Sequence, residues 1–138
     1  MKFDRKIFIN LLLFTAIIVV IACATMCQSS TAIQIAFSDE LVAVSSMDYG
    51  MNIEYTYVDS LALVNDPVLG SADGGKNKPE LKSGLWQNDT WGQYHLCFNP
   101  NATNCIVVQT IDGQTFVFNY NTNEKTEEAN RTFMSRIT

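Results

Sequence analysis

The stretch IVVQTIDGQTFVF, residues 106–118, carries the strongest local fold signal in the chain. Asp112-Gly113 lies between two segments rich in β-branched and aromatic residues, and this dipeptide favours the tight turns that join antiparallel strands. The stretch therefore predicts a β-hairpin whose second strand is Thr115–Phe118.

Before this hairpin, short apolar segments alternate with polar turn signals. Apolar residues recur there with a period of two, which is typical of strands that bury one face. We expect such strands at Ile33–Phe37, Leu41–Val44, Ile53–Tyr57, Leu61–Val64, Leu85-Trp86 and Tyr94–Phe98. Residues 65–84 hold several turn signals in succession and predict a long loop.

After the hairpin the period changes. Ala129, Phe133 and Ile137 recur every four residues, with acidic residues before them and arginines toward the end. This pattern predicts one amphipathic helix whose charges suit the helix dipole, capped by Asn121 or Asn123. The expected order is about seven strands followed by one helix.

Residues 7–26 form a nearly unbroken apolar run, IFINLLLFTAIIVVIACATM. A helix of about 20 residues is about 30 Å long, the thickness of the hydrocarbon core of a bilayer. Lys2, Arg5 and Lys6 precede the run, and no Lys or Arg follows it before Lys76. The positive-inside rule therefore predicts a single-pass protein of the cell membrane whose C-terminal domain is extracytoplasmic.

Three fates fit the apolar run: a retained transmembrane helix, a cleaved secretory signal, and a lipoprotein with its lipid on Cys23. Ala22 supplies the small residue that precedes a lipid-attachment cysteine. The length of the run favours the retained anchor, because the apolar core of a signal peptide is shorter. The chain thus divides into an anchor or signal segment, 1–27, and a β-domain, 28–138.

The β-domain is acidic. From Gln28 onward it has six Lys and Arg against thirteen Asp and Glu, a net charge of −7. Binding to nucleic acid or to phosphoinositide headgroups relies on clustered Lys and Arg, so we expect neither partner.

Residue types that carry catalysis are sparse. His95 is the only histidine, and we expect it on the outer face of a strand. No neighbouring residues have metal-ligand spacing, and no nucleophile, base and orienting group can be assembled. The sequence therefore predicts no enzyme, no metal and no cofactor, with an envelope enzyme as the alternative.

Two residue pairs are candidate sites. Cys97 and Cys105 lie in consecutive strand segments joined by a turn-forming stretch, so a symmetric hairpin would place them opposite each other and allow a disulfide. Two buried free thiols are the alternative. Trp86 and Trp91 flank a polar turn, where an exposed tryptophan would form a contact surface; burial in the core is the alternative.

The outer domain resembles the bacterial pleckstrin-homology-like (bacterial PH) domains that follow a membrane helix. The stretches that carry the resemblance are Phe37–Leu41, Tyr49–Ile53, Val58–Leu63, Gly84–Trp86, Gly92–Tyr94, Thr110–Gly113, Val117–Asn119 and Glu124–Thr126. The resemblance implies a mainly β fold: a PH-like seven-stranded bent antiparallel barrel, capped by one C-terminal α-helix, after an N-terminal transmembrane helix.

The same resemblance implies a binding module. In the eukaryotic relatives, Lys and Arg in the first hairpin loop bind phosphoinositides, whereas Ser38–Glu40 and Ser46–Tyr49 contain no cation here. We therefore expect a protein or peptide partner, bound at a sheet edge or in a groove beside the helix.

Overall fold

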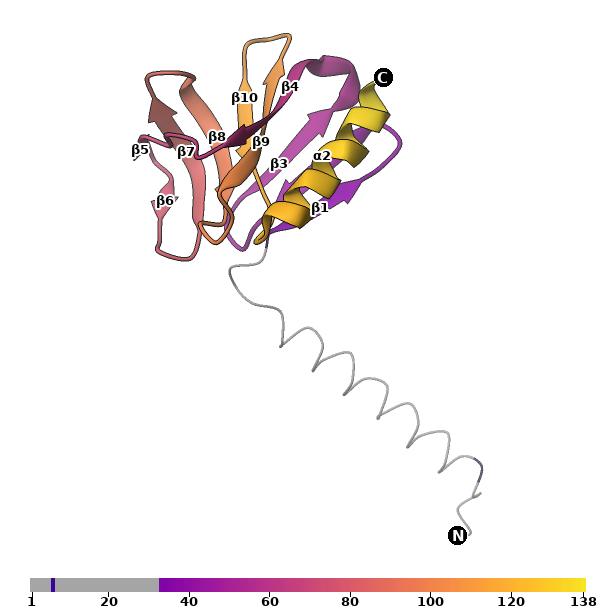
Figure 1. Ribbon diagram of the computed structural model, residues 1–138, viewed down its shortest axis with the longest axis horizontal. Coiled ribbons are helices and arrows are strands. Elements are labelled where there is room, and N and C mark those ends of the chain that lie inside the picture. Colours follow the sequence, from indigo (N-terminus) through magenta and orange to yellow (C-terminus); the bar gives the residue numbers. More distant parts are fainter. Residues whose placement is uncertain (1–5, 7–32) are drawn as a thin grey trace.

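The computed structural model describes Lys6 and residues 33–138 of the chain (Figure 1). Residues 33–138 form two β-sheets and one α-helix. The small sheet contains β1 (Gln34–Phe37), β2 (Leu41–Ser45) and β3 (Gly50–Glu54). The large sheet contains β4 (Val58–Asn65), β5 (Ser71–Ala72), β6 (Lys76–Asn77), β7 (Lys82–Asn88), β8 (Gly92–Phe98), β9 (Asn104–Thr110) and β10 (Thr115–Phe118). A short 3₁₀-helix, η1 (Tyr55–Tyr57), joins the sheets, and α2 (Asn123–Ile137) ends the chain.

The small sheet is an antiparallel meander in the order β1-β2-β3. Its alternation of apolar and polar residues places every second side chain on the inner face, as the sequence predicts. Val42, Val44, Met51 and Ile53 are buried there, whereas Asn52 on the opposite face is exposed. The sheet therefore needs a second layer on one side only.

The large sheet has the strand order β4-β9-β10-β8-β7-β5, and β6 also pairs with β7. β10 lies between β8 and β9: Val117 is opposite Val107 in an antiparallel pair and opposite Leu96 in a parallel pair. The consecutive strands β8 and β9 consequently do not pair with each other.

The predicted hairpin around Asp112-Gly113 is confirmed as β9 and β10. Gly113 has φ +87°, a left-handed conformation that glycine adopts at little cost. The loop comprises residues 111–114 rather than two residues, because the Thr110 N–H and the Gln114 carbonyl already pair at 2.9 Å.

Two hydrophobic cores lie on opposite faces of β8, β9 and β10, because neighbouring residues of a strand point to opposite sides. The interlayer core lies between the two sheets and α2 and includes Val44, Ile53, Cys97, Ile106, Val108, Phe116, Phe118 and Phe133. The far-face core is made of Trp86, Tyr94, Leu96, Phe98, Cys105, Val107 and Val117. The chain leaving β4 covers the far-face core: Leu69 packs on it, and the Tyr94 hydroxyl donates to the Leu69 carbonyl at 2.5 Å.

Helix α2 packs with the predicted face. Phe133 is fully buried, and its ring meets Phe37 of β1, Tyr55 of η1 and Phe118 of β10 at centroid distances of 6.0, 5.9 and 6.3 Å. The helix therefore fastens the small sheet to the large one. In Figure 1 it lies beside β1 and β3, away from β5 and β6.

The predicted helix caps are wrong. Thr122 is the N-cap, and its hydroxyl accepts from the Lys125 N–H at 3.2 Å. The Asn123 carboxamide oxygen instead accepts from the N–H groups of Thr103 and Asn104, at 2.9 and 3.2 Å. Asn123 thus ties the start of α2 to the start of β9.

The predicted fold class is wrong. The chain is mainly β with one C-terminal helix, but its strands form two sheets that do not close into a seven-stranded barrel. η1 redirects the chain after β3, so that β4 pairs with β9 and not with β3. The parallel pair of β8 and β10 also departs from the predicted antiparallel arrangement.

Within Lys6 and residues 33–138, no helix is long and apolar enough to cross a membrane. The N-terminal transmembrane helix of the predicted fold class is therefore not found in the described residues. The apolar run 7–26, on which that prediction was based, lies outside the described residues.

Candidate functional site

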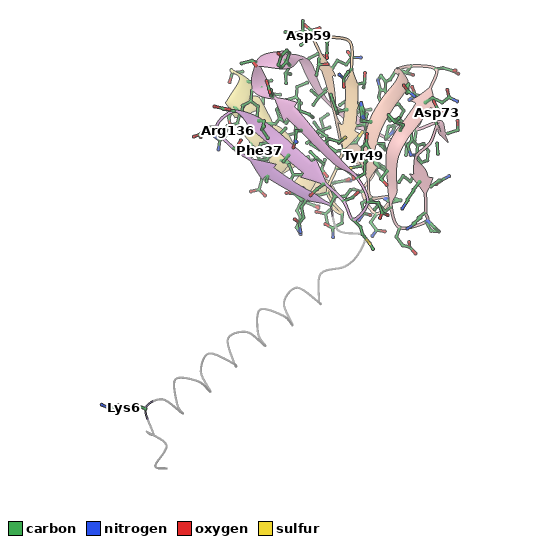
Figure 2. All side chains as sticks on the ribbon, turned by 180° about the vertical axis from the view of Figure 1, so that it is seen from behind. Lys6, Phe37, Tyr49, Asp59, Asp73 and Arg136 are labelled. Carbon is green, nitrogen blue, oxygen red and sulfur yellow. The ribbon has the colours of Figure 1, made fainter. Side chains whose placement is uncertain are left out.

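The turn between β2 and β3 joins the small sheet to the large sheet. The Cys97 thiol of β8 donates to the Ser46 hydroxyl at 3.9 Å. The Asp48 carboxylate lies 2.9 Å from the Lys76 ammonium group of β6. Tyr49, the last residue of this turn, lies at the boundary between the two sheets (Figure 2). We call residues 46–49 the clamp turn.

A third contact of the clamp turn is with His95. The Tyr49 hydroxyl and His95 Nδ1 are 2.5 Å apart. The imidazole is also stacked on Phe116 of β10, with ring centroids 4.8 Å apart and an angle of 14° between the ring planes. His95 therefore lies between the sheets, and its predicted position on an outer face is wrong.

Burial lowers the pKa of His95, and a hydrogen bond with the Gln114 side chain opposes this effect in part. Gln114 Nε2 donates to an Asp112 carboxylate oxygen at 3.0 Å, which leaves Oε1 of Gln114 to accept from His95. The neutral imidazole then accepts from Tyr49 at Nδ1 and donates at Nε2. Burial also raises the pKa of Tyr49, so its hydroxyl keeps its proton at neutral pH.

Beyond Gln114 this chain of hydrogen bonds reaches a small polar pocket. Its volume is about 290 Å³, and it lies between β3, η1 and the β9–β10 hairpin, lined by Asn52, Glu54, Tyr57, Thr110, Asp112 and Gln114 among others. Hydrogen bonds from Thr110 and Gln114 lower the pKa of Asp112 and keep it ionised. The pocket contains two carboxylates and no cation.

A second hollow lies beside β1, the edge strand of the small sheet. A groove of about 390 Å³ runs between β1 and α2, lined by Ile35, Phe37, Tyr120, Lys125, Glu128, Ala129 and Thr132. We call it the β1–α2 groove. Its floor is apolar because Ile35 and Phe37 turn the same face of β1 toward the helix. Ala129 leaves room that a larger helix residue would fill.

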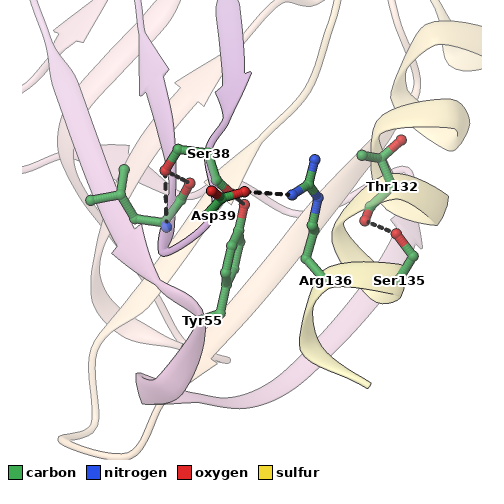
Figure 3. Close-up of polar contacts among 7 residues, drawn as sticks. Ser38, Asp39, Tyr55, Thr132, Ser135 and Arg136 are labelled. Carbon is green, nitrogen blue, oxygen red and sulfur yellow. Dashed lines mark hydrogen bonds and ion pairs between the residues drawn. The ribbon is translucent and has the colours of Figure 1, made fainter.

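Polar contacts link the turn after β1 to the last turns of α2 and to η1 (Figure 3). Arg136 of α2 lies 3.7 Å from the Asp39 carboxylate in the turn between β1 and β2. The Tyr55 hydroxyl donates to the Ser38 carbonyl at 2.7 Å in the same turn. The ion pair links the end of α2 to the turn after β1, and the Tyr55 hydrogen bond links η1 to the same turn.

The outer edge of β1 offers backbone hydrogen-bonding groups. The Ser38 N–H donates to the Leu41 carbonyl at 2.9 Å, which makes this pair a hydrogen-bonded one. Because such pairs alternate along an antiparallel ladder, the N–H and C=O groups of Ile35 and Phe37 point away from β2. The Tyr120 hydroxyl donates to the Ile35 carbonyl at 3.2 Å, and the two N–H groups have no partner within residues 33–138.

The two tryptophans that were predicted as a possible contact surface differ in their burial. Trp86 is only 2% exposed and belongs to the far-face core, where its indole N–H donates to the Ser83 carbonyl at 3.0 Å, so it is no contact surface. Trp91 is half-buried and packs edge-on against Tyr94, with ring centroids 5.1 Å apart.

Cys97 and Cys105 are both buried free thiols, so the predicted disulfide is not formed. Cys97 is paired with Phe118 of β10, which is in turn paired with Ile106 of β9. Two strand spacings of about 4.8 Å separate the cysteine-bearing strands, farther than the roughly 7 Å between Cα atoms that a disulfide allows. The side chains also lie in different cores.

The third predicted site, lipid attachment at Cys23, lies outside the described residues. Among residues that the structure describes, no group of three or more His, Cys, Asp or Glu side chains is placed to hold a metal ion. Sequence reasoning expected a sheet edge or a groove beside the helix as the binding surface but did not identify β1 as its other wall. It missed the contact of Tyr49 with His95, which joins residues far apart in the chain.

The chain matches no family model, no curated protein and no solved structure. Its candidate sites are therefore interpreted from their geometry.

Proposed function

We propose that the β-domain is a binding module that recognises a protein partner through an extended segment added to the outer edge of β1 at Ile35 and Phe37. The observation that carries the proposal is the pair of outward N–H groups of Ile35 and Phe37 beside the apolar β1–α2 groove. An added strand receives main-chain hydrogen bonds from such an edge, and alternate side chains of the segment enter the neighbouring groove.

The length of β1 limits the added segment. β1 has four residues, so only a short stretch of partner can pair with it. Side chains opposite Ile35 and Phe37 point into the groove, and those between them face outward beside Ala36. We expect a segment with apolar residues at alternate positions.

The binding role agrees with the one implied by the resemblance to bacterial PH-like domains, but it rests on the groove and not on a barrel. An envelope enzyme and a lipoprotein anchored through Cys23 remain the alternatives from the sequence. The location of the domain outside the cytoplasm, at the cell membrane, is a proposal supported by the cation asymmetry around residues 7–26 alone.

Selection from a displayed library of random decapeptides, on the full chain in a mild detergent, tests this function. Selected peptides are expected to have alternating apolar residues and to shift the amide resonances of β1 and α2. Ala129→Leu fills the groove and is expected to weaken binding about tenfold or more. Ser135→Leu adds similar bulk at an exposed position of α2 outside the groove and is the matched control.

A second variant addresses the backbone. Ile35→Pro removes an N–H that points away from β2, so the β1–β2 ladder keeps its bonds while the edge loses a donor. Thermal unfolding of each variant checks that it is folded. Binding that is equal in the wild type, Ala129→Leu and Ile35→Pro contradicts the proposed site.

A further inference from the structure

The two walls of the β1–α2 groove belong to different parts of the molecule. β1 is part of the small sheet, in fixed register with β2 from Gln34–Ser45 to Phe37–Val42. Helix α2 is tied to the large sheet, since Asn123 accepts from the backbone of Thr103 and Asn104. The width of the groove therefore depends on how the small sheet sits against the large sheet.

The clamp turn holds the small sheet at the other end of β2. β2 ends at Ser45, directly before the turn, so a shift of the turn moves β2 and its partner β1 together. Of the contacts that the clamp turn makes with the large sheet, the one between Tyr49 and His95 involves a side chain whose ordinary pKa is near neutral pH.

We propose that the Tyr49–His95 contact is a pH-sensitive joint that controls the β1–α2 groove, a regulation that rests on the proposed binding function. The neutral imidazole accepts a hydrogen bond from the Tyr49 hydroxyl at Nδ1. A protonated imidazole has no acceptor, so the Tyr49 hydroxyl has to turn and leave its own proton without this partner. Protonation thus weakens the hold of the clamp turn on the large sheet.

No carboxylate offsets the charge that His95 would gain. The titratable or charged side chains on the elements around it are Asp48, Tyr49, Glu54, Lys82, Cys97 and Asp112. Asp48 is paired with Lys76, and Asp112 is hydrogen-bonded to Thr110 and Gln114. Within the part of the chain that the structure describes, none of them forms an ion pair with His95. Burial acts in the same direction, since it lowers the pKa of the imidazole.

Nuclear magnetic resonance of the full chain in a mild detergent tests the joint without any ligand. The chain has one histidine, so a single imidazole signal reports its titration. We expect a pKa below the ordinary value of 6.5. Between pH 7.5 and pH 5.0 we expect lost hydrogen-exchange protection in residues 41–54, with little change in β7, whose Trp86 lies in the far-face core. A pKa at or above 6.5, or uniform protection across this range, overturns the proposal.

Two variants separate the joint from the proposed function. His95→Gln keeps a hydrogen-bonding side chain but cannot titrate, and Tyr49→Phe removes the hydroxyl while retaining the ring. Both are expected to abolish the pH dependence of hydrogen exchange in residues 41–54. If either variant fails to fold, the titration of His95 and the hydrogen exchange of the wild type still test the pH-sensitive joint.

The peptide with the strongest binding in the library selection then serves as the probe. We expect its affinity for the wild type to fall at least about threefold from pH 7.5 to pH 5.0, and to stay constant for His95→Gln. Equal affinity of the wild type at both pH values overturns the control of the groove. If His95 titrates as expected but the library yields no binding peptide, the proposed function and the control of the groove are both contradicted. The pH-sensitive contact between Tyr49 and His95 then stands without a binding role.

Discussion

The interlayer core and the far-face core share the strands β8, β9 and β10 but are built in different ways. The interlayer core brings together both sheets and α2, and polar groups such as Tyr49 and His95 lie at its margin. The far-face core is formed within one sheet and by the chain that crosses it, with Trp86 and Tyr94 at its centre.

Because of this difference, the titratable groups of the two cores respond differently to pH. On the far face, burial raises the pKa of Cys105 to about 12 and also raises the pKa of Tyr94. Neither group therefore changes charge near neutral pH. At the interlayer side, burial lowers the pKa of His95, whose ordinary value is near neutral pH. Acid is therefore expected to act on the contact between the layers and not on Cys105 or Tyr94.

The largest effect is expected from Phe133→Ala, which breaks the interlayer core. Phe133 is fully buried between three aromatic rings, and truncation of such a residue costs about 3–5 kcal/mol. Denaturant unfolding of the full chain measures the change in the free energy of unfolding. Met134→Ala, at a neighbouring position that is 45% exposed, is the control and is expected to change little. Equal losses in both variants would show that α2 does not fasten the layers.

A smaller loss is expected from Asn119→Leu, which removes a fully buried carboxamide just after β10. The Asn119 carboxamide accepts from the Asn99 N–H at 2.7 Å and donates to the carbonyls of Asn99 and Asn104 at 3.0 and 3.1 Å. Leucine has a similar size but leaves these buried groups unpaired, at a cost of about 2–3 kcal/mol. Asn121→Leu, at an exposed position, is the matched control in the same unfolding measurement. A loss no greater than that of the control contradicts this role.

The third prediction sharpens the contrast in titration. Because burial lowers the pKa of His95 in the folded state, the unfolded chain binds the proton more readily. The contribution of neutral His95 to the free energy of unfolding is therefore fully present above the ordinary pKa of 6.5. It is lost as pH falls from there through the pKa of the folded state. Unfolding of the wild type and of His95→Gln at several pH values should differ in slope across this window. If the free energies of unfolding of the two proteins change with pH in parallel, His95 is not the source of the pH dependence.

The smallest effect is expected from reductant, which tests the separation of the two cysteines. Cys97 and Cys105 lie in different cores as free thiols, so reductant should leave the free energy of unfolding unchanged. Burial raises the pKa of Cys97 to about 11, which makes the thiolate scarce and alkylation of the folded protein slow. Mass spectrometry after denaturation without reductant should find both thiols alkylated. A bridged peptide containing both residues would contradict the strand order.

The sequence by itself determined which residues share a face. The period of two placed Val42, Val44 and Ile53 inside, and the period of four placed Phe133 against the sheets. These patterns depend on the fixed geometry of strand and helix, so a single segment contains all the information needed. The hairpin at Gly113 is equally local, since its strands are joined by their own turn.

Only the tertiary structure decided which strands are neighbours. A period of two is the same whether β9 pairs with β8 or with β10, and the insertion of β10 between them depends on contacts between distant segments. That insertion separates Cys97 from Cys105 and places Phe116 beside His95. The outcome of such pairing is set by the packing of whole layers, which no local pattern encodes. The barrel, the disulfide and the outward histidine were therefore wrong, whereas the buried faces of β2, β3 and α2 were right.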